Sequence, residues 1–398
     1  MLMSIALSLF PLIVFADEAP PTHFGLLEAA VDFHAAQQLG IQWVRGQLWW
    51  DMVQRGPNGD LIWEMFDGYV KDAQLYGFEI LIILFPFAPW DQERCHAGQR
   101  MLGRPCDTDA YKRFVRAAVE RYDGDGADDM PGLRYPIHHW EVFNEPAMKD
   151  LPPFYDFTPK DYFELLKAAN GEIKAACPQC KVVQAGVANL DPEKEQFLQS
   201  YLDLGGGDYF DIANIHFIHF GDFDTLNVGP FKEILEDYGI AKPIWVTEVQ
   251  IESGPGTHYP HLSDEEAAAL LVKSYIRAFS LGADKLFYVV LKPIPEFPPN
   301  VVAASLIDTR SNKRPTYFAL KTMIELLGHF TDVERITDSL YRFDTSQGII
   351  YAAWSGATLS SDTLGETVQV IDIGGEARIM SFEDTSLSDV PVYIKPAK

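Results

Sequence analysis

A regular alternation of short apolar runs with longer amphipathic stretches is the feature that most constrains the fold. Eight of the runs have the length and composition of buried strands, and most are followed by apolar residues at helical spacing. The predicted strands are His23–Leu26, Gln42–Arg45, Glu79–Phe85, His139–Asn144, Val182–Val187, Ile212–Ile218, Ile244–Glu248 and Leu286–Leu291. The predicted helices include Met65–Tyr76, Ala110–Tyr122, Asp161–Ala176, Lys194–Leu204, Pro230–Tyr238 and Asp264–Leu281.

Eight strand–helix repeats over about 300 residues predict a closed parallel (β/α)8 barrel, the TIM barrel, across residues 22–328. An open doubly wound sheet has a similar pattern, but its first strand normally leads into a glycine-rich turn. Here the first strand runs into Leu26, Leu27 and Glu28, so the barrel is favoured. Thr158 before Pro159, and Ser263 with Glu266 three residues later, are helix-start signals.

The pattern changes near residue 330, where short β-rich runs are separated by Gly, Ser and Asp turns. These runs are Leu340–Phe343, Gly348–Trp354, Thr367–Ile371, Ala377–Ser381 and Val390–Ile394. No helix pattern interrupts them. We therefore expect residues 329–398 to form a small antiparallel β-domain that packs on the barrel.

The charge balance is strongly acidic, with a formal net charge of −25. Nucleic acids and anionic membrane surfaces attract clusters of Lys and Arg, and the sequence has no such cluster. The acidity also weakly disfavours a polyanionic substrate such as pectin. Residues 1–16 are apolar, uncharged and too short to span a bilayer, and they end in Val14-Phe15-Ala16. This favours a signal peptide and a secreted or periplasmic protein. An N-terminal membrane tether and a mis-assigned start are the alternatives.

The four cysteines form two local pairs, Cys95 with Cys106 and Cys177 with Cys180. An exported protein keeps such pairs as disulfides, each closing a short loop. Free thiols and a four-cysteine zinc site are the competing interpretations. The ten residues between Cys95 and Cys106 are too many for a zinc knuckle.

Two predicted strands end in glutamate, and barrel enzymes place their chemistry at the carboxyl ends of strands. Glu145 follows the fourth strand in the run WEVFNEP, and Glu248 ends the seventh strand in the run WVTE. Strands four and seven lie nearly opposite each other around the barrel mouth. Two facing carboxyl groups are what cleavage of a glycosidic bond requires, one to protonate the leaving oxygen and one to attack the anomeric carbon.

These runs resemble clan A of the glycoside hydrolases, the TIM-barrel enzymes that include β-xylosidases, cellulases and β-galactosidases. The resemblance covers roughly residues 22 to 325. It implies a retaining β-glycosidase in which Glu145 is the acid/base, Glu248 is the nucleophile and Asn144 binds the sugar 2-hydroxyl. It also implies that Arg45, at the end of the second strand, hydrogen-bonds the nucleophile, and that His216 on the sixth strand lines the site.

The sequence departs from the clan pattern at two positions. Ile218 stands where many members have a tyrosine that contacts the nucleophile. The eighth strand lacks the tryptophan that lies under the sugar in many members, and Tyr288 is a candidate to replace it in part. These departures leave the reaction class intact but give no guide to the sugar.

Several residues have a structural interpretation as well as a functional one. Glu141 shares strand parity with Glu145, so we expect a buried structural carboxylate with a basic partner. Arg45 is a candidate for that partner as well as for a site residue. His138 and His139 are expected to be packing or surface residues, because no metal-ligand spacing joins them to an acid.

Three tryptophans, Trp49, Trp50 and Trp90, follow the second and third strands, where they either stack on sugar or fill the core. The run Asp123–Asp129 is similar to part of a calcium loop. It lacks the terminal glutamate and the ligand register of an EF-hand, so a solvated acidic loop is expected.

The predicted function is therefore hydrolysis of a β-linked oligosaccharide or polysaccharide, with no cofactor and no metal. A transglycosylase with the same site and a non-catalytic carbohydrate-binding barrel are the alternatives. A barrel that had lost catalysis would be expected to lack one carboxylate, and neither is missing here. A metal-dependent hydrolase fits poorly, because the strands carry no His-x-His or other ligand cluster.

Overall fold

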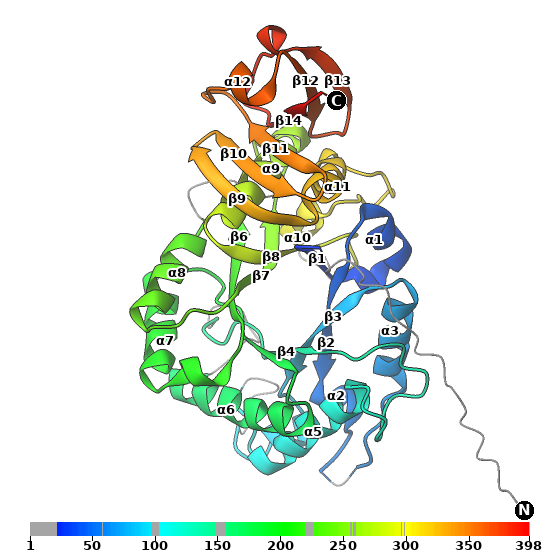
Figure 1. Ribbon diagram of the computed structural model, residues 1–398. Coiled ribbons are helices and arrows are strands. Elements are labelled where there is room, and N and C mark those ends of the chain that lie inside the picture. Colours follow the sequence, from blue (N-terminus) through cyan, green and yellow to red (C-terminus); the bar gives the residue numbers. More distant parts are fainter. Residues whose placement is uncertain are drawn as a thin grey trace, which may run out of the picture.

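A parallel sheet closed into a barrel forms the body of the protein in the computed structural model (Figure 1). The structure describes residues 22–57, 59–96, 103–148, 157–219, 226–254, 257, 260–295, 297 and 299–397, and the side chains of residues 217–219 are not described. The predicted signal segment, residues 1–16, lies outside the described residues.

Within these residues, eight strands make the barrel, each close to a predicted strand. They are β1 (Phe24–Leu27), β2 (Trp43–Trp49), β3 (Glu79–Phe85), β4 (His139–Val142), β5 (Lys181–Gln184), β6 (Ala213–His219), β7 (Ile244–Ile251) and β8 (Ala283–Tyr288). Their order is β5-β4-β3-β2-β1-β8-β7-β6, and neighbouring strands in this order pair in parallel. The two ends meet through isolated parallel bridges, Val183 with Ile212 and Val187 with Ile215. The predicted (β/α)8 barrel is confirmed.

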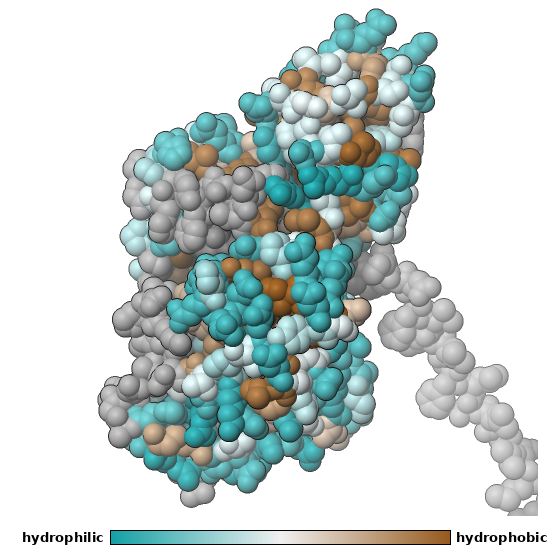
Figure 2. Space-filling view, turned by 90° about the vertical axis from the view of Figure 1, so that its left-hand side faces the viewer, coloured by the Kyte–Doolittle hydropathy of each residue, from teal (hydrophilic) through white to brown (hydrophobic). Residues whose placement is uncertain are grey.

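Helices cover the outside of the barrel (Figure 1). They are α1 (Phe33–Leu39), α2 (Trp50–Val53), α3 (Glu64–Leu75), α4 (Pro89–Gln92), α5 (Thr108–Tyr122), α6 (Pro159–Ala176), α7 (Pro192–Asp203), α8 (Val228–Asp237), α9 (Asp264–Ser280), α10 (Pro299–Ala304) and α11 (Pro315–Leu327). Both predicted helix starts carry a capping box, Thr158 with Asp161 on α6 and Ser263 with Glu266 on α9. The face over α7 and α8 is mainly hydrophilic with scattered hydrophobic residues (Figure 2). The described helices include none that is both long and apolar enough to cross a bilayer.

Aromatic side chains fill the barrel interior below the carboxyl ends of the strands. Trp43, Trp245 and Phe287 belong to a buried cluster separate from the main core, and the Trp43 and Trp245 rings are 5.2 Å apart. His139 packs against both tryptophans, as expected for a packing residue. A Cβ on Gly25 would overlap the Phe287 ring, so glycine is required at this point of β1. The filled interior leaves the polar chemistry to the mouth above it.

An antiparallel sheet follows the barrel, as predicted. It has the order β13-β12-β14-β11-β10-β9. Its elements are β9 (Phe330–Thr337), β10 (Leu340–Thr345), β11 (Gly348–Ala353), α12 (Ser361–Leu364), β12 (Thr367–Asp372), β13 (Ala377–Ser381) and β14 (Val392–Pro396). Two of these were not predicted, β9, whose middle is mostly exposed and polar, and the single turn α12.

The second sheet packs on the α9 side of the barrel. Phe330 lies 5.0 Å from Phe279 of α9, and Lys273 of α9 lies over the ring of Trp354. One buried cluster runs from the barrel helices into Tyr341 and Phe343 of β10. Because the core is continuous, a domain boundary at residues 328 and 329 stays a prediction.

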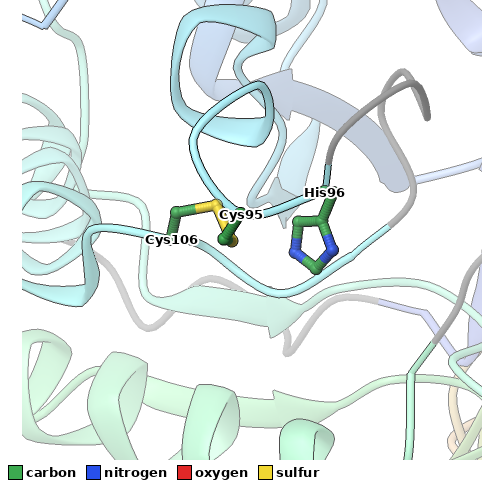
Figure 3. A group of neighbouring side chains, drawn as sticks. All are labelled: Cys95, His96 and Cys106. Carbon is green, nitrogen blue, oxygen red and sulfur yellow. A yellow bond between two sulfur atoms is a disulfide. The ribbon is translucent and has the colours of Figure 1, made fainter.

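Both predicted disulfides are present. Cys95 is bonded to Cys106 after α4, and Cys177 is bonded to Cys180 between α6 and β5. His96 lies beside the first bridge, and its Nε2 is 3.0 Å from the carbonyl oxygen of Arg104 (Figure 3). The bridges hold the two loops without a metal, so the zinc interpretation of the cysteines is wrong.

Candidate active site

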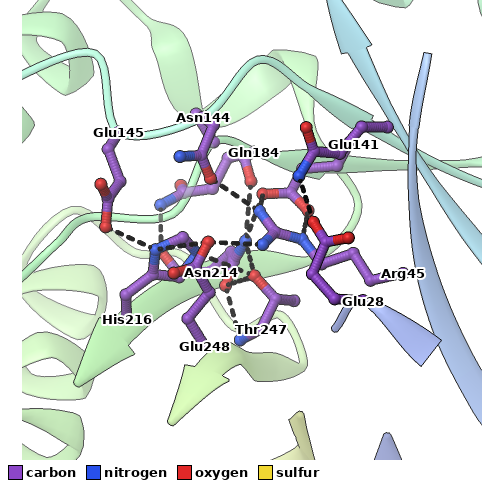
Figure 4. A network of polar contacts seen from close by, with 12 residues as sticks. Glu28, Arg45, Glu141, Asn144, Glu145, Gln184, Asn214, His216, Thr247 and Glu248 are labelled. Carbon is purple, nitrogen blue, oxygen red and sulfur yellow. Dashed lines mark hydrogen bonds and ion pairs between the residues drawn. The ribbon is translucent and has the colours of Figure 1, made fainter. Parts of the chain in front are cut away.

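A buried arginine organises the mouth of the barrel. Arg45, inward-facing on β2, donates Nε and Nη2 to the two carboxylate oxygens of Glu141, both at 2.8 Å. Its Nη1 donates to Glu248 Oε1 at 2.6 Å, and Nη2 also donates to Asn144 Oδ1 at 2.7 Å. The Arg45 and Glu141 side chains are both 0% exposed. Glu141 is therefore the expected buried structural carboxylate. Arg45 binds both Glu141 and Glu248, so it is a structural partner and a site residue at once (Figure 4).

The turn after β4 sets Glu145 above this pair. β4 ends at Val142, two residues before the predicted end, because the backbone turns at Phe143. Phe143 and Glu145 have φ values of 73° and 44°, in the left-handed region that residues with a Cβ rarely adopt. Packing holds the turn, since the Phe143 ring lies 5.4 Å from Phe87 and 4.8 Å from Phe157. Strain of this kind persists where the surroundings impose it, often at functional sites.

A bulge in β7 delivers Glu248. Ile215 pairs with Val246, but His216 pairs with Glu248, so Thr247 is one residue extra in β7. Strict alternation would send Thr247 and Glu248 to opposite faces. The bulge lets both face the barrel mouth, and β7 then continues to Ile251 instead of ending at Glu248 as predicted.

His216 joins the two glutamates. Its Nδ1 lies 2.8 Å from Glu145 Oε1 and 3.7 Å from Glu248 Oε1, and its Nε2 lies 2.9 Å from Thr247 Oγ1. The ring is completely buried. It fits because residue 186 is glycine, where a Cβ would overlap the imidazole.

A polar layer beneath fixes these groups. Asn214 Nδ2 lies 2.9 Å from Glu141 Oε1 and 2.8 Å from Thr247 Oγ1. Gln184 Nε2 donates to the carbonyl oxygen of Asn214 at 2.9 Å, and the Tyr201 hydroxyl donates to Gln184 Oε1 at 2.8 Å. Every member of this layer has a partner, as buried polar groups require.

Electrostatics push the charged groups toward defined states. Burial would raise the pKa of Glu248, but the positive charges of His216 and Arg45, with the Arg45 hydrogen bond, hold it below its ordinary value. Burial would lower the pKa of His216, but Glu248 and Glu145 raise it above its ordinary value. These two directions favour an ionised carboxylate at Glu248 and a protonated imidazole at His216.

Among the residues that the structure describes, three groups of side chains have donor atoms within 4.8 Å of one another, as a metal site needs. Cys95 and Cys106 are consumed by their disulfide. The acidic group around Asp123 belongs to the predicted acidic loop, which is exposed from Gly124 to Asp128 but buries Asp123 itself. Asp129 accepts there from the backbone N–H groups of Gly124 and Gly126. In the third group, Glu145, His216 and Glu248, both imidazole nitrogens already have hydrogen-bond partners. Proton transfer suits this third group better than metal binding.

The aromatic residues predicted as candidates to stack on sugar differ in their exposure. Trp50 is fully buried in the core beside Trp90, whereas Trp49 is half-buried and stacks on Phe85 at 4.1 Å. Tyr288 cannot replace the missing tryptophan. It faces outward from β8, is fully buried, and donates its hydroxyl to the carbonyl oxygen of Ala304 at 2.7 Å. The side chain of Ile218 lies outside the described residues.

Solved structures of carbohydrate-cleaving enzymes match most of the chain. A family 39 glycoside hydrolase from Bacteroides cellulosilyticus WH2 has a TM-score of 0.69 at 18% identity, with 95% of this chain and 81% of that chain covered. A glucosidase from Croceicoccus marinus has a TM-score of 0.66 at 14% identity, covering 96% and 98%. A GH39 β-xylosidase from Caulobacter crescentus has a TM-score of 0.62 at 16% identity, also covering 96% and 98%.

The chain has the fold of these glycoside hydrolases. This finding agrees with the resemblance to clan A that the WEVFNEP run carries. No family profile matches the chain, and no curated protein matches its sequence. At identities this low the likeness establishes the fold, so the case for chemistry rests on the side chains at the mouth.

The structure brings together all five predicted site residues, which are Arg45, Asn144, Glu145, His216 and Glu248. Sequence reasoning missed Thr247, Gly186, Gln47 and Glu28, which stand beside them. Glu28 carried one available signal, since it is a charged residue directly after an apolar strand.

Proposed function

We propose that this protein is a retaining β-glycosidase with Glu145 as acid/base and Glu248 as nucleophile. One observation carries the proposal: a carboxylate oxygen of Glu145 and one of Glu248 lie within 4.8 Å of each other. Retaining enzymes hold their two carboxyl groups about 5–5.5 Å apart, whereas inverting enzymes leave about 6.5–9.5 Å for a water. The short gap favours direct attack by Glu248 on the sugar.

The surroundings support the two roles. Glu248 accepts from Arg45 and is kept ionised, which suits a nucleophile. Glu145 Oε1 lies 2.8 Å from Nδ1 of His216, whose raised pKa favours a protonated ring, so a proton is available at this end of the site. Two carboxyl groups in unlike environments are the expected arrangement for an acid and a nucleophile.

The reaction then follows in two displacements. Glu145 donates a proton to the glycosidic oxygen while a Glu248 oxygen bonds to the anomeric carbon and the leaving-group bond breaks. Glu145, now ionised, takes a proton from water, whose oxygen attacks the same carbon and releases Glu248. The two inversions return the β-anomer. Arg45 holds Asn144 through its Oδ1, and we expect Asn144 to bind the sugar 2-hydroxyl, as the resemblance to clan A implies.

Export is part of the proposal. Two disulfides within the described residues favour an oxidising compartment, secreted or periplasmic.

The test is a panel of aryl β-glycosides together with β-glucan, xylan and mannan, with the products of the best substrate followed by NMR. We expect the β-anomer to appear first and the α-anomer to grow only by mutarotation. An initial α-anomer would exclude retention, and a wild-type protein that cleaves no β-glycoside would exclude the proposed function. A product joined to a second sugar instead of water would identify a transglycosylase.

A further inference from the structure

A third carboxylate faces the mouth, and the mechanism does not use it. Glu28 directly follows β1 with a φ of 57°, again in the left-handed region. It is half-buried and belongs to the polar network of Figure 4. Gln47 Nε2 donates to its Oε1 at 2.8 Å. Burial and the negative charge of Glu248 raise the pKa of Glu28, while Arg45 opposes them. Glu28 therefore lies within electrostatic range of the nucleophile and its arginine.

Side chains of β2 hold Glu28 in place. Arg45, Gln47 and Trp49 share inward parity on this strand. Trp49 Nε1 donates to Gln47 Oε1 at 3.2 Å, which leaves the Gln47 amide group free to donate to Glu28. Trp49 is itself fixed by its stack on Phe85. A chain of hydrogen bonds thus runs along one wall of the mouth and ends on a carboxylate.

That carboxylate keeps most of its accepting capacity. An ionised carboxylate has two oxygens and about four lone-pair positions. Gln47 fills one position, and no lysine or arginine among the described residues forms an ion pair with Glu28. A half-buried acceptor beside a reacting centre is suited to donors carried by the substrate. Hydroxyl groups of a sugar ring are donors of this kind.

The charges nearby select among sugars. Arg45 is already bound to Glu141 and Glu248, and Lys292, which follows β8, binds Asp32 at 2.5 Å. His216, the other positive charge at the mouth, is paired with Glu145 at 2.8 Å. The carboxylates of Glu28 and Glu248 therefore face a substrate with these three cations already paired, so none is left to offset a further negative charge. A uronic acid would add one, and like charges in a partly desolvated site repel strongly.

We propose that Glu28 is a specificity residue that accepts hydrogen bonds from ring hydroxyl groups of a neutral sugar in the glycone position and disfavours uronic acids. This inference rests on the proposed function. It concerns the sugar whose anomeric carbon Glu248 attacks.

Two substitutions separate charge from contact. Glu28→Gln keeps the shape and removes the charge. Glu28→Asn shortens the side chain with a residue that tolerates positive φ, so the turn is preserved. Glu79→Gln is the control, because Glu79 is also a partly buried carboxyl with a raised pKa but lies at the opposite end of the barrel, at the start of β3. Melting temperatures establish that each variant is folded.

Kinetics on an aryl β-glycoside, its monodeoxy analogues and the matching uronide then test the contact. Loss of one charge-assisted hydrogen bond should reduce kcat/KM for the parent glycoside roughly 10- to 150-fold in Glu28→Asn. Deoxygenation at the contacted hydroxyl should cost wild type a similar factor and the Asn variant much less. Glu28→Gln should shift the ratio of neutral glycoside to uronide toward the uronide, and Glu79→Gln should change neither.

The failures are distinct. A wild-type protein inactive on every β-glycoside overturns the proposed function and this inference with it. An active wild type whose Glu28 variants keep full activity, or lose the same factor on the parent, the deoxy sugars and the uronide, overturns the inference alone.

Discussion

Replacing Arg45 by methionine tests the buried charge network. The substitution keeps most of the aliphatic bulk and removes four hydrogen bonds, two to Glu141, one to Glu248 and one to Asn144. It leaves the fully buried Glu141 without its cation. Removing one partner of a buried ion pair costs about 3–5 kcal/mol.

The cost converts to a melting temperature. A chain of 398 residues has an unfolding entropy of about 0.8 kcal/mol/K, at about 2.1 cal/mol/K per residue. A loss of about 3–5 kcal/mol therefore lowers Tm by about 4–6 °C at neutral pH. Arg116→Met is the matched control, because Arg116 is 54% exposed and pairs with Glu172 on the surface. Such a pair contributes at most about 1 kcal/mol.

The pH dependence has a definite sign. The folded-state pKa of Glu248 is depressed, so its contribution to stability is present above the unfolded pKa of about 4.3 and is lost as pH falls through the folded value. The difference in Tm between wild type and Arg45→Met should therefore be largest near neutral pH, at about pH 7, and should shrink in acid. The acidic limb of the kcat/KM profile should also move to higher pH, because Glu248, the proposed nucleophile, loses its cation. A Tm within about 1 °C of wild type at neutral pH, or a deficit that grows in acid, would refute the reasoning.

Two further predictions concern substitutions at single positions of the site. Glu145→Ala should slow glycosides with poor leaving groups by roughly 100- to 10,000-fold, spare activated aryl glycosides, and regain rate with azide as a β-glycosyl azide forms; equal losses without rescue would remove Glu145 as acid/base. Gly186→Ala should lower both Tm and activity, because the new Cβ displaces the His216 ring. Gly171→Ala in α6, where a Cβ meets open space, should instead raise Tm slightly, through about 0.5–1 kcal/mol of helix propensity. Unchanged activity in Gly186→Ala would show that the position of His216 does not matter.

The barrel could be read from the sequence because its evidence is periodic and repeated. Each strand of a parallel barrel is buried on both faces, so it appears as an apolar run whatever its exact ends. The ends were less predictable. The predicted β8 begins too late, at Leu286, because the charge of Lys285 favours a turn in the sequence pattern. Lys285 belongs to β8, and its ammonium group lies over the rings of Trp43 and Trp245. Cation–π contacts let a charge occupy a position that hydropathy assigns to a turn.

The site was predictable where a short motif carries it and unpredictable where backbone geometry does. Glu145 and Glu248 follow from the runs around them. The inward turn of Thr247 follows from a bulge, which adds a residue without any residue type that announces it. The direction of the Tyr288 side chain was unpredictable for a related reason. Phe287 fills the barrel interior, so the next residue on the strand, Tyr288, faces outward. A sequence shows which residues end a strand, but not on which face each side chain emerges.

The excess of carboxylates at the mouth bears on how an acid can remain available there. Glu28, Glu141 and Glu248 share one guanidinium, that of Arg45. Negative charge in excess of its counter-charges raises the affinity of the whole cluster for a proton. The group that takes it is His216, whose imidazole pKa is raised by Glu248 and Glu145. The arrangement that favours an ionised Glu248 thus also favours a proton on His216, 2.8 Å from Glu145, so in the proposed mechanism the states of the nucleophile and of the acid depend on one another.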